Sequence, residues 1–307
     1  YLVQQLDKLP TAFLIGPSGS GKSSIIRAGV IPALLSIGSL ARLTHRQDAR
    51  TLEWLIVEFR PGADPLHALA EAIAHLPTGG GDAAHIMQRL CAEGATLGAL
   101  NMWPPHARLL IFVDQFEELY TLCTSAATRR VFVELLLHSV LSPAPDSAPI
   151  ALIMAMRADF VNQALTHRPL ADALQHGGVV LGPMARPELR RAIEEPARNR
   201  GVTYEPGLTE RLLDDVGDEP GNLPLLQFAL AELWTRRTGY QITHDAYDEI
   251  GRVSGALASY ADQVYTQLTD EEQVVARRLL IQLVQPGDET GDTRRPALRT
   301  ELSAAAW

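Results

Sequence analysis

The chain has 307 residues, 46% of them hydrophobic and 21% charged, and its formal net charge at pH 7 is −9. These proportions are ordinary for a soluble globular protein of roughly two or three folding units. The acidic balance argues against a surface built mainly for nucleic acid, and no apolar run approaches the roughly 20 residues that a membrane helix needs. We therefore expect neither nucleic acid nor a membrane as a partner.

Short apolar runs in the first part of the chain predict buried strands, and the stretches between them predict helices. The strands are expected at residues 11–15, 53–59, 108–114, 150–156 and 178–183. The helices are expected at residues 25–35, 65–75, 83–93 and 129–141. Strands separated by helices predict a parallel α/β sheet with helices on both of its faces.

Beyond residue 183 the strand-type runs cease and the pattern becomes helical. Amphipathic stretches follow at residues 186–201, 206–217, 223–237 and 270–284. Each has apolar residues at helical spacing along one face. The sequence therefore predicts an α/β domain over residues 1–185, followed by a helical remainder.

A phosphate-binding loop is predicted between the first strand and the first helix. Gly16, Gly21, Lys22 and Ser23 satisfy the pattern G-x-x-x-x-G-K-[ST]. Glycines let the backbone curl around phosphate oxygens, the lysine reaches the β- and γ-phosphates, and the serine hydroxyl completes the shell of Mg²⁺. A chance match of this pattern is on the order of one in a thousand. The expected nucleotide-binding residues are Gly16, Pro17, Ser18, Gly19, Ser20, Gly21, Lys22, Ser23 and Ser24.

The apolar run "LLIFVD" ends at Asp114, which we predict to bind Mg²⁺ directly or through water, together with Ser23. The alternative is an ordinary core strand that happens to end in a carboxylate. One strand-type run before Asp114 and another after it favour the additional-strand division of P-loop NTPases.

The residues after Asp114 are the candidates for catalysis. Gln115 can orient a water molecule but cannot accept its proton, so Glu117 or Glu118 must supply the base if hydrolysis occurs. Both glutamates are equally explained as solvated acids in the first turn of a helix, and Glu117 is slightly preferred as the base. The pattern predicts firm binding and slow hydrolysis.

Several motifs together resemble the STAND class of signalling NTPases and, within it, the bacterial novel-STAND branch, which is often joined to WD-type repeats. These motifs are "GPSGSGKSSIIRAGVIPAL", "VDQFEELY", "MRADF" and "GNLPLLQFALAELW", and the resemblance runs from about Pro10 to Thr300. It implies ATP or ADP and Mg²⁺ as cofactors. It also implies a helical lid domain at residues 186–252 and the truncated start of a winged-helix domain at residues 253–307.

The resemblance also implies roles for single residues. Arg157, at the end of the fourth predicted strand, would sense the γ-phosphate; the alternative is a surface arginine that caps a strand end. Pro224 would pack near the nucleotide base. The usual spacing is one residue between glycine and proline, whereas two separate Gly221 from Pro224, so a helix start capped by Asn222 is an equal alternative. For Arg60 a structural turn is favoured.

The function that the resemblance implies is a nucleotide-controlled switch in a larger signalling or defence protein. ADP would hold the domains closed, ATP would open them, and the open form would self-associate and activate an effector, with slow hydrolysis as a timer. One rival is a continuously cycling AAA+-like ATPase acting on DNA or protein, which the acidic charge and Gln115 oppose. Another is a scaffold that holds nucleotide permanently.

The cysteines and the two ends of the chain indicate its cellular location and whether it is part of a longer protein. Cys91 and Cys123 match no zinc or disulfide spacing, and no secretory signal is found, so we expect a reducing, cytoplasmic location. Because the chain begins at Tyr1 and ends at Trp307 after an alanine run, we expect a fragment of a longer protein whose sensor and effector domains lie elsewhere.

Overall fold

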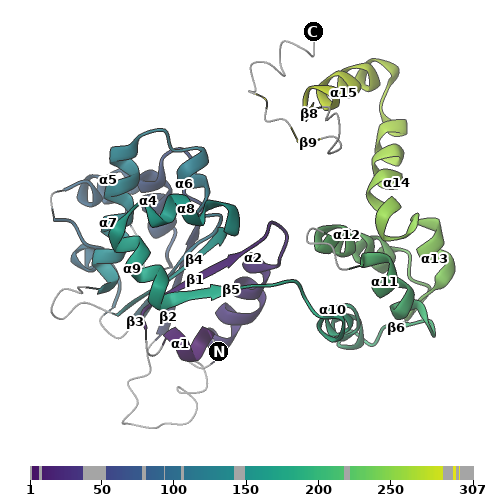
Figure 1. Ribbon diagram of the computed structural model, residues 1–307, viewed down its shortest axis with the longest axis horizontal. Helices are drawn as coiled ribbons and strands as arrows, with labels where there is room; N and C mark the ends of the chain where they lie inside the picture. Colours follow the sequence, from purple (N-terminus) through teal and green to yellow (C-terminus); the bar gives the residue numbers. More distant parts are fainter. Residues whose placement is uncertain are drawn as a thin grey trace. The chain divides into compact units, whose positions relative to one another are not determined.

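The computed structural model of the protein comprises two compact units, Tyr1–Pro183 and Met184–Trp307 (Figure 1). It describes residues 2–6, 9–36, 53–77, 81–92, 94–104, 107–141, 149–217, 222–285, 293–294 and 297. The domain division predicted from the sequence, with boundaries at residues 185 and 252, stays a prediction. Among the described helices, none combines the length and apolarity that crossing a membrane requires.

The first unit is built on a parallel sheet of five strands in the order β2-β3-β4-β1-β5. The strands are β1 (Thr11–Gly16), β2 (Glu53–Phe59), β3 (Ala107–Val113), β4 (Ile150–Arg157) and β5 (Gly178–Val180). All lie where the apolar runs predicted them. Because β4 separates β1 from β3, the sheet has the additional-strand order, as expected.

Alternate side chains of β3 supply two separate parts of the core. Leu109, Ile111 and Val113 pack with helices at residues 65–74, 83–90, 126–141 and 168–177, whereas Leu110 and Phe112 pack with helices at residues 2–6 and 26–36. All five side chains are fully buried. Successive strand residues point to opposite faces, so a continuous apolar run requires helices on both sides of the sheet. Figure 1 shows this arrangement.

Helices alternate with the strands along the first unit. They are α1 (Leu2–Leu6), α2 (Lys22–Ile25), the π-helical η1 (Ile26–Val30), a continuation over residues 31–36, α4 (Pro65–Ala74), α5 (Ala83–Leu90), α6 (Glu118–Thr121), α7 (Ala126–Leu141), α8 (Val161–Leu165) and α9 (Arg168–Gly177). Single-turn 3₁₀ helices lie at Gly98–Leu100 and Ala158–Phe160.

Some helix ends differ from those predicted, for local reasons. The helix expected from residue 129 begins at Ala126, because the Ser125 hydroxyl accepts the N–H of Thr128 at 3.1 Å. Asp64 and Asp82 cap α4 and α5 in the same way. The predicted end of α5, at residue 93, lies outside the described residues. Helices α8 and α9 were not predicted, and a turn separates these short segments.

The second unit consists mainly of helices; four lie at the predicted amphipathic stretches, whereas those at residues 244–249 and 252–267 were not predicted. The helices are α10 (Arg186–Arg198), α11 (Leu208–Val216), α12 (Asn222–Thr235), α13 (His244–Glu249), α14 (Arg252–Gln267) and α15 (Asp270–Gln282). The expectation that strands cease after residue 183 was wrong in detail. The short strands β6 (Thr203–Tyr204) and β7 (Gln241–Ile242) pair in parallel, and β8 (Val284–Gln285) pairs antiparallel with β9 (Thr293–Arg294). Two-residue strands are too short to produce a period-two pattern. The winged-helix assignment stays a prediction.

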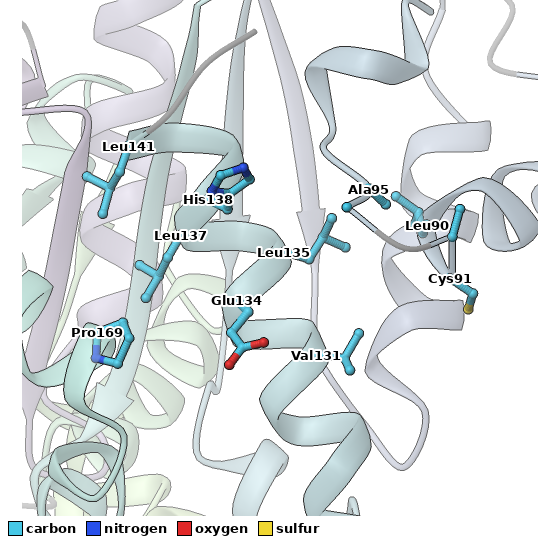
Figure 2. A pocket seen from close by; sticks show the side chains of 12 residues that line it. Leu90, Cys91, Ala95, Val131, Glu134, Leu135, Leu137, His138, Leu141 and Pro169 are labelled. Atoms are coloured by element: carbon cyan, nitrogen blue, oxygen red, sulfur yellow. The ribbon is translucent and has the colours of Figure 1, made fainter.

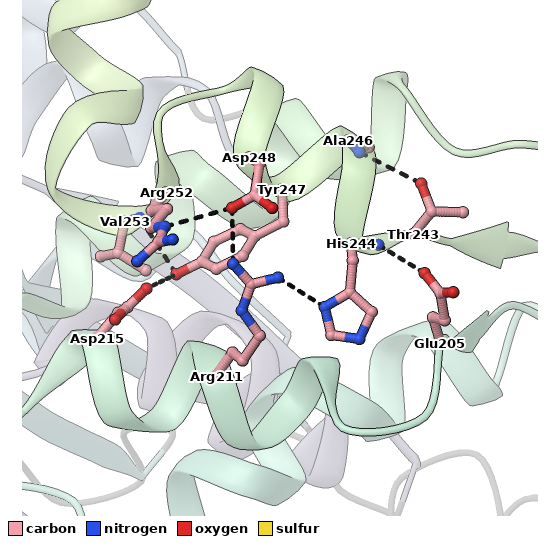
Figure 3. A network of polar contacts seen from close by, with 10 residues as sticks. All are labelled: Glu205, Arg211, Asp215, Thr243, His244, Ala246, Tyr247, Asp248, Arg252 and Val253. Atoms are coloured by element: carbon pink, nitrogen blue, oxygen red, sulfur yellow. Dashed lines mark hydrogen bonds and ion pairs between the residues drawn. The ribbon is translucent and has the colours of Figure 1, made fainter.

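A polar network joins α11, α13 and α14 (Figure 3). The buried Tyr247 donates its hydroxyl hydrogen to Asp215 Oδ2 at 2.6 Å and accepts the N–H of Val253 at 3.3 Å. Arg211 binds Asp248 at 2.6 Å and lies 2.7 Å from His244 Nδ1. Burial, together with the Asp215 carboxylate, raises the pKa of Tyr247, so its hydroxyl stays protonated as the donor.

We predict that Tyr247→Phe destabilises the second unit by about 1–3 kcal/mol, because the Val253 N–H loses its acceptor and Asp215 its donor. The measurement is urea unfolding followed by far-UV circular dichroism. Tyr260→Phe is the matched control, since Tyr260 is exposed on α14 and its ring contact with Phe228 survives the change. Equal unfolding midpoints for the two variants would contradict the prediction.

Candidate nucleotide-binding site

The predicted site residues of the first unit meet at the carboxyl edge of the sheet. Gly16 ends β1 and is paired in register with Arg157, which ends β4. Asp114 directly follows β3, and its N–H donates to the carbonyl of Phe59 at the end of β2 at 2.9 Å. Ligand sites of open parallel sheets lie at this edge. The strand order therefore brings together motifs that are far apart in sequence.

The loop after β1 is tightly curled. Gly19 and Gly21 have φ angles of 74° and 84°, a conformation that side-chain-bearing residues rarely adopt. A Cβ on Gly16 would lie 2.8 Å from Ser20 Oγ and 2.9 Å from the carbonyl oxygen of Leu181. Glycine is thus required at these places for the loop to close.

Lys22 folds back under the loop. Its Nζ donates to the carbonyls of Gly16 at 3.0 Å and Pro17 at 2.6 Å, and lies 3.4 Å from Ser20 Oγ. Partial burial lowers the pKa of its amine; Glu117 opposes this shift more than any other charge, while Arg157 adds to it. The ammonium is therefore held inside the loop, where phosphate oxygens can replace the carbonyls.

The donor set of the loop fits a polyphosphate. The first N–H groups of a helix have no intrahelical acceptor, and those of Lys22 and Ser23 open α2 directly after the loop. Together with the Lys22 ammonium they offer an anion several convergent donors. A bound nucleotide would place its phosphates there.

Ser23 and Asp114 are in direct contact. The Ser23 hydroxyl donates to Asp114 Oδ1 at 2.6 Å, and Asp114 is only 1% exposed. A hydroxyl and a carboxylate side by side are hard oxygen ligands of the kind that Mg²⁺ prefers. These two residues would hold the ion, which supplies charge neutralisation for the phosphates when bound.

Both candidate bases accept backbone hydrogen bonds. Glu117 accepts the N–H of Arg157 at 3.2 Å, and Glu118 accepts the N–H of Gly62 at 3.2 Å. Gln115 has a φ of 51°, and its N–H donates to Asp114 Oδ1 at 3.0 Å. The carboxylates thus tie the loop after β3 to the ends of β4 and β2.

The side chain of Arg157 pairs with a residue that the sequence analysis missed. Its Nη2 and Nε donate to Asp159 Oδ2 at 2.5 and 3.1 Å, and its guanidinium lies 5.8 Å from the ring centroid of Phe160. Asp159 belongs to the quoted motif "MRADF", so its proximity in sequence was visible. Arg157 lies at the correct edge, and its role as phosphate sensor stays a prediction.

Arg27 and Glu58 were also missed. Arg27 Nη2 donates to Asp114 Oδ2 at 3.0 Å, and its Nε donates to Glu58 Oε1 at 2.5 Å. Arg60, for which a structural turn was favoured, places its Nε 3.9 Å from Asp114 Oδ2. The spacing of four residues between Ser23 and Arg27 put both on one helix face and could have suggested this contact.

Pro224 belongs to the second unit, where it is exposed in the first turn of α12. Asn222 begins that helix, and its Nδ2 donates to the carbonyl of Val216 at 2.6 Å, so it satisfies the end of α11. Gly221 lies outside the described residues. The contact of Pro224 with a base stays a prediction.

A separate cavity of about 670 Å³ has no residue of the phosphate loop in its lining (Figure 2). It is lined by Leu90, Cys91, Ala92, Gly94, Ala95, Val131, Glu134, Leu135, Leu137, His138, Leu141 and Pro169. Most of these side chains are apolar, and none belongs to the predicted site. It lacks the convergent donors that a polyphosphate needs.

Comparison with known proteins gave one family. The family described as Novel STAND NTPase 1 matches residues 1–306. A comparison with curated proteins found no match.

Solved structures of P-loop ATPases are similar in fold. The ORC1 protein of Aeropyrum pernix in complex with DNA is 17% identical with a TM-score of 0.53, covering 99% of this chain and 75% of that one. The ORC2 protein of the same organism, in ADPNP–ADP complexes, is 15% identical with a TM-score of 0.49, covering 100% and 90%. The Thermotoga maritima RuvB Holliday junction branch migration motor is 15% identical with a TM-score of 0.40, covering 93% and 76%. At these identities the ORC1 likeness shows the fold alone.

We predict that Gly16→Ala weakens nucleotide binding by about tenfold or more and costs about 1–3 kcal/mol of stability, because the added methyl forces the loop open. The checks are titration with a fluorescent nucleotide and thermal unfolding. Gly29→Ala carries the same change on the following helix, where a Cβ meets nothing within 4 Å. It should bind as the unaltered protein does, with equal or slightly higher stability. Similar affinities for both variants would refute the prediction.

Proposed function

This chain belongs to the novel STAND NTPase 1 family, and on that basis we propose that it is a nucleotide switch that holds ADP or ATP with Mg²⁺ and hydrolyses ATP slowly. The chain is a P-loop NTPase of the STAND type. The switch, its chemistry and its partners are the proposal.

The observation that carries the proposal is the state of the two acids after Asp114. Glu117 and Glu118 both accept backbone N–H groups, and Gln115, which directly follows Asp114, cannot take a proton. One oxygen of each carboxylate is thus already bonded to the backbone, and that bond must lengthen before this oxygen can accept a proton from water. The site therefore supports holding a nucleotide more than breaking it.

Of the two glutamates, Glu117 is the better candidate for the base. Among the neighbouring charges, that of Glu117 has the largest effect on the pKa of the Lys22 amine. Glu118 is not among the charges that shift this pKa. Glu118 is bonded to the turn after β2 instead. The group close to the lysine is close to the γ-phosphate that the lysine would bind.

The proposed switch uses contacts that ATP makes and ADP lacks. Lys22 would leave the carbonyls of Gly16 and Pro17 for phosphate oxygens, and Arg157 would leave Asp159 for the γ-phosphate. A nucleotide can shift a conformational equilibrium only by its differential affinity for the two states. To bind Arg157, the γ-phosphate would have to compete with the Asp159 carboxylate, which pairs with this guanidinium.

We also propose a role in signalling and a cellular location for this protein. Activation would lead to self-association and signalling, with defence as one such use, through sensor or effector domains such as WD-type repeats outside this sequence. Cys91 and Cys123 are both free, which supports a reducing, cytoplasmic location. The alternative is a continuously cycling ATPase acting on DNA or protein, since the similar ORC1 structure was solved in complex with DNA.

The test is to denature the purified protein, identify the released nucleotide by chromatography, and time ATP turnover with Mg²⁺, with and without DNA. We expect tightly held ADP and turnover well below the roughly 1–100 s⁻¹ of kinases. An empty site with fast turnover that DNA stimulates would replace the switch with the cycling ATPase.

We further predict that Glu117→Gln slows single-turnover hydrolysis of labelled ATP by about 100-fold or more and leaves nucleotide affinity within a few-fold. Glutamine keeps an acceptor oxygen for the Arg157 N–H, so only the proton-accepting capacity is lost. Glu118→Gln is the matched control and should hydrolyse at nearly the original rate. The reverse ranking of the two variants would assign the base to Glu118.

A further inference from the structure

We infer that Arg27 competes with Mg²⁺ for Asp114, so that this arginine sets the metal concentration at which the site takes up nucleotide. The inference rests on the proposed function, because it concerns the same nucleotide site. It assigns a positioning residue that the phosphate-loop pattern does not contain.

The guanidinium of Arg27 bridges two carboxylates. Its Nη2 donates to Asp114 Oδ2 at 3.0 Å and its Nε to Glu58 Oε1 at 2.5 Å. Arg27 lies in η1, one turn after Ser23, and Glu58 lies near the end of β2. A planar guanidinium has separate donors in a fixed geometry and can serve both acids at once.

Both carboxylate oxygens of Asp114 accept hydrogen bonds from within the protein. Its Oδ1 accepts the hydroxyl of Ser23 and the N–H of Gln115, and its Oδ2 accepts Arg27. A carboxylate buried to this degree needs a compensating charge, since burying it unpaired is strongly unfavourable. Arg27 supplies that charge at 3.0 Å, with Arg60 further away at 3.9 Å, so the protein compensates the carboxylate through its own side chains.

A divalent cation at Ser23 and Asp114 would meet Arg27 at the same carboxylate. Two cations that share one carboxylate repel each other. The guanidinium also compensates part of the carboxylate's negative charge, which weakens the attraction between the carboxylate and the metal. The Arg27 side chain is 46% exposed and keeps Glu58 as a partner, so it can move off Asp114 into water. Arg27 thus stabilises the metal-free site and raises the Mg²⁺ concentration required to fill it.

The experiment titrates Mg²⁺ into the protein with a fixed amount of fluorescent ADP, starting from EDTA, and reads the midpoint of nucleotide binding. Arg27→Gln should lower that midpoint by roughly three- to tenfold, as expected for removing a partly exposed like charge. Arg27→Lys, which keeps the charge but cannot bridge both acids, should fall between. Arg130→Gln removes an equal charge from the exposed face of α7 and should change nothing.

The inference is overturned if the Mg²⁺ midpoint of Arg27→Gln equals or exceeds that of the unaltered protein. A higher midpoint would mean that Arg27 aligns Asp114 for the metal. If Arg27→Gln does not fold, Arg27→Lys decides, and a midpoint not below that of the unaltered protein overturns it. If the unaltered protein binds nucleotide and Arg27→Gln has the same Mg²⁺ midpoint, this inference is wrong but the proposed function is not contradicted.

A second readout needs no nucleotide. The melting temperatures of the nucleotide-free proteins are compared in EDTA and in excess MgCl₂. Arg27→Gln should melt below the unaltered protein in EDTA and gain more from Mg²⁺, because its Asp114 keeps only the more distant Arg60, at 3.9 Å, as a compensating charge until the metal binds. An equal gain in melting temperature for the two proteins would contradict the competition between Arg27 and Mg²⁺. This readout does not depend on nucleotide binding, whereas a failure of the unaltered protein to bind nucleotide would contradict the proposed function.

Discussion

The buried carboxylate of Asp114 is the constraint around which the site is arranged. It is almost inaccessible to water, so three elements must supply its partners: Ser23 at the start of α2, Arg27 one turn later, and the Gln115 N–H, which the backbone turn after β3 directs back. The helix after the phosphate loop is thereby fastened to the end of β3, although β4 lies between β3 and β1. Satisfying one charge thus fixes the geometry in which phosphate and metal would be bound.

The two glutamates extend that fastening to the neighbouring strands. Glu117 holds the Arg157 N–H at the end of β4, and Glu118 holds the Gly62 N–H beyond β2. Acids that brace the edge of the sheet are poorly placed to act as bases without rearrangement.

The second unit is stabilised by a different principle. Its strands have two residues each, and a polar network around Tyr247, Arg211 and His244 supplements the apolar core that its helices form. The His244 Nδ1 lies 2.7 Å from the Arg211 guanidinium, and its Nε2 lies 3.1 Å from the carbonyl oxygen of Pro206. Such a network locks the relative positions of α11, α13 and α14.

The sequence by itself determined the five strands of the first unit, the phosphate loop and Asp114, because continuous apolar runs, glycine geometry and a strand end are local properties that neighbouring residues carry. It could also place Arg157 at a strand end. Only the tertiary structure decided that Glu58 meets Arg27, that Glu117 meets Arg157 and that Glu118 meets Gly62, pairs separated by 31, 40 and 56 positions. Those contacts depend on which strands are neighbours and on how each loop turns at the edge of the sheet, and no local pattern encodes that order.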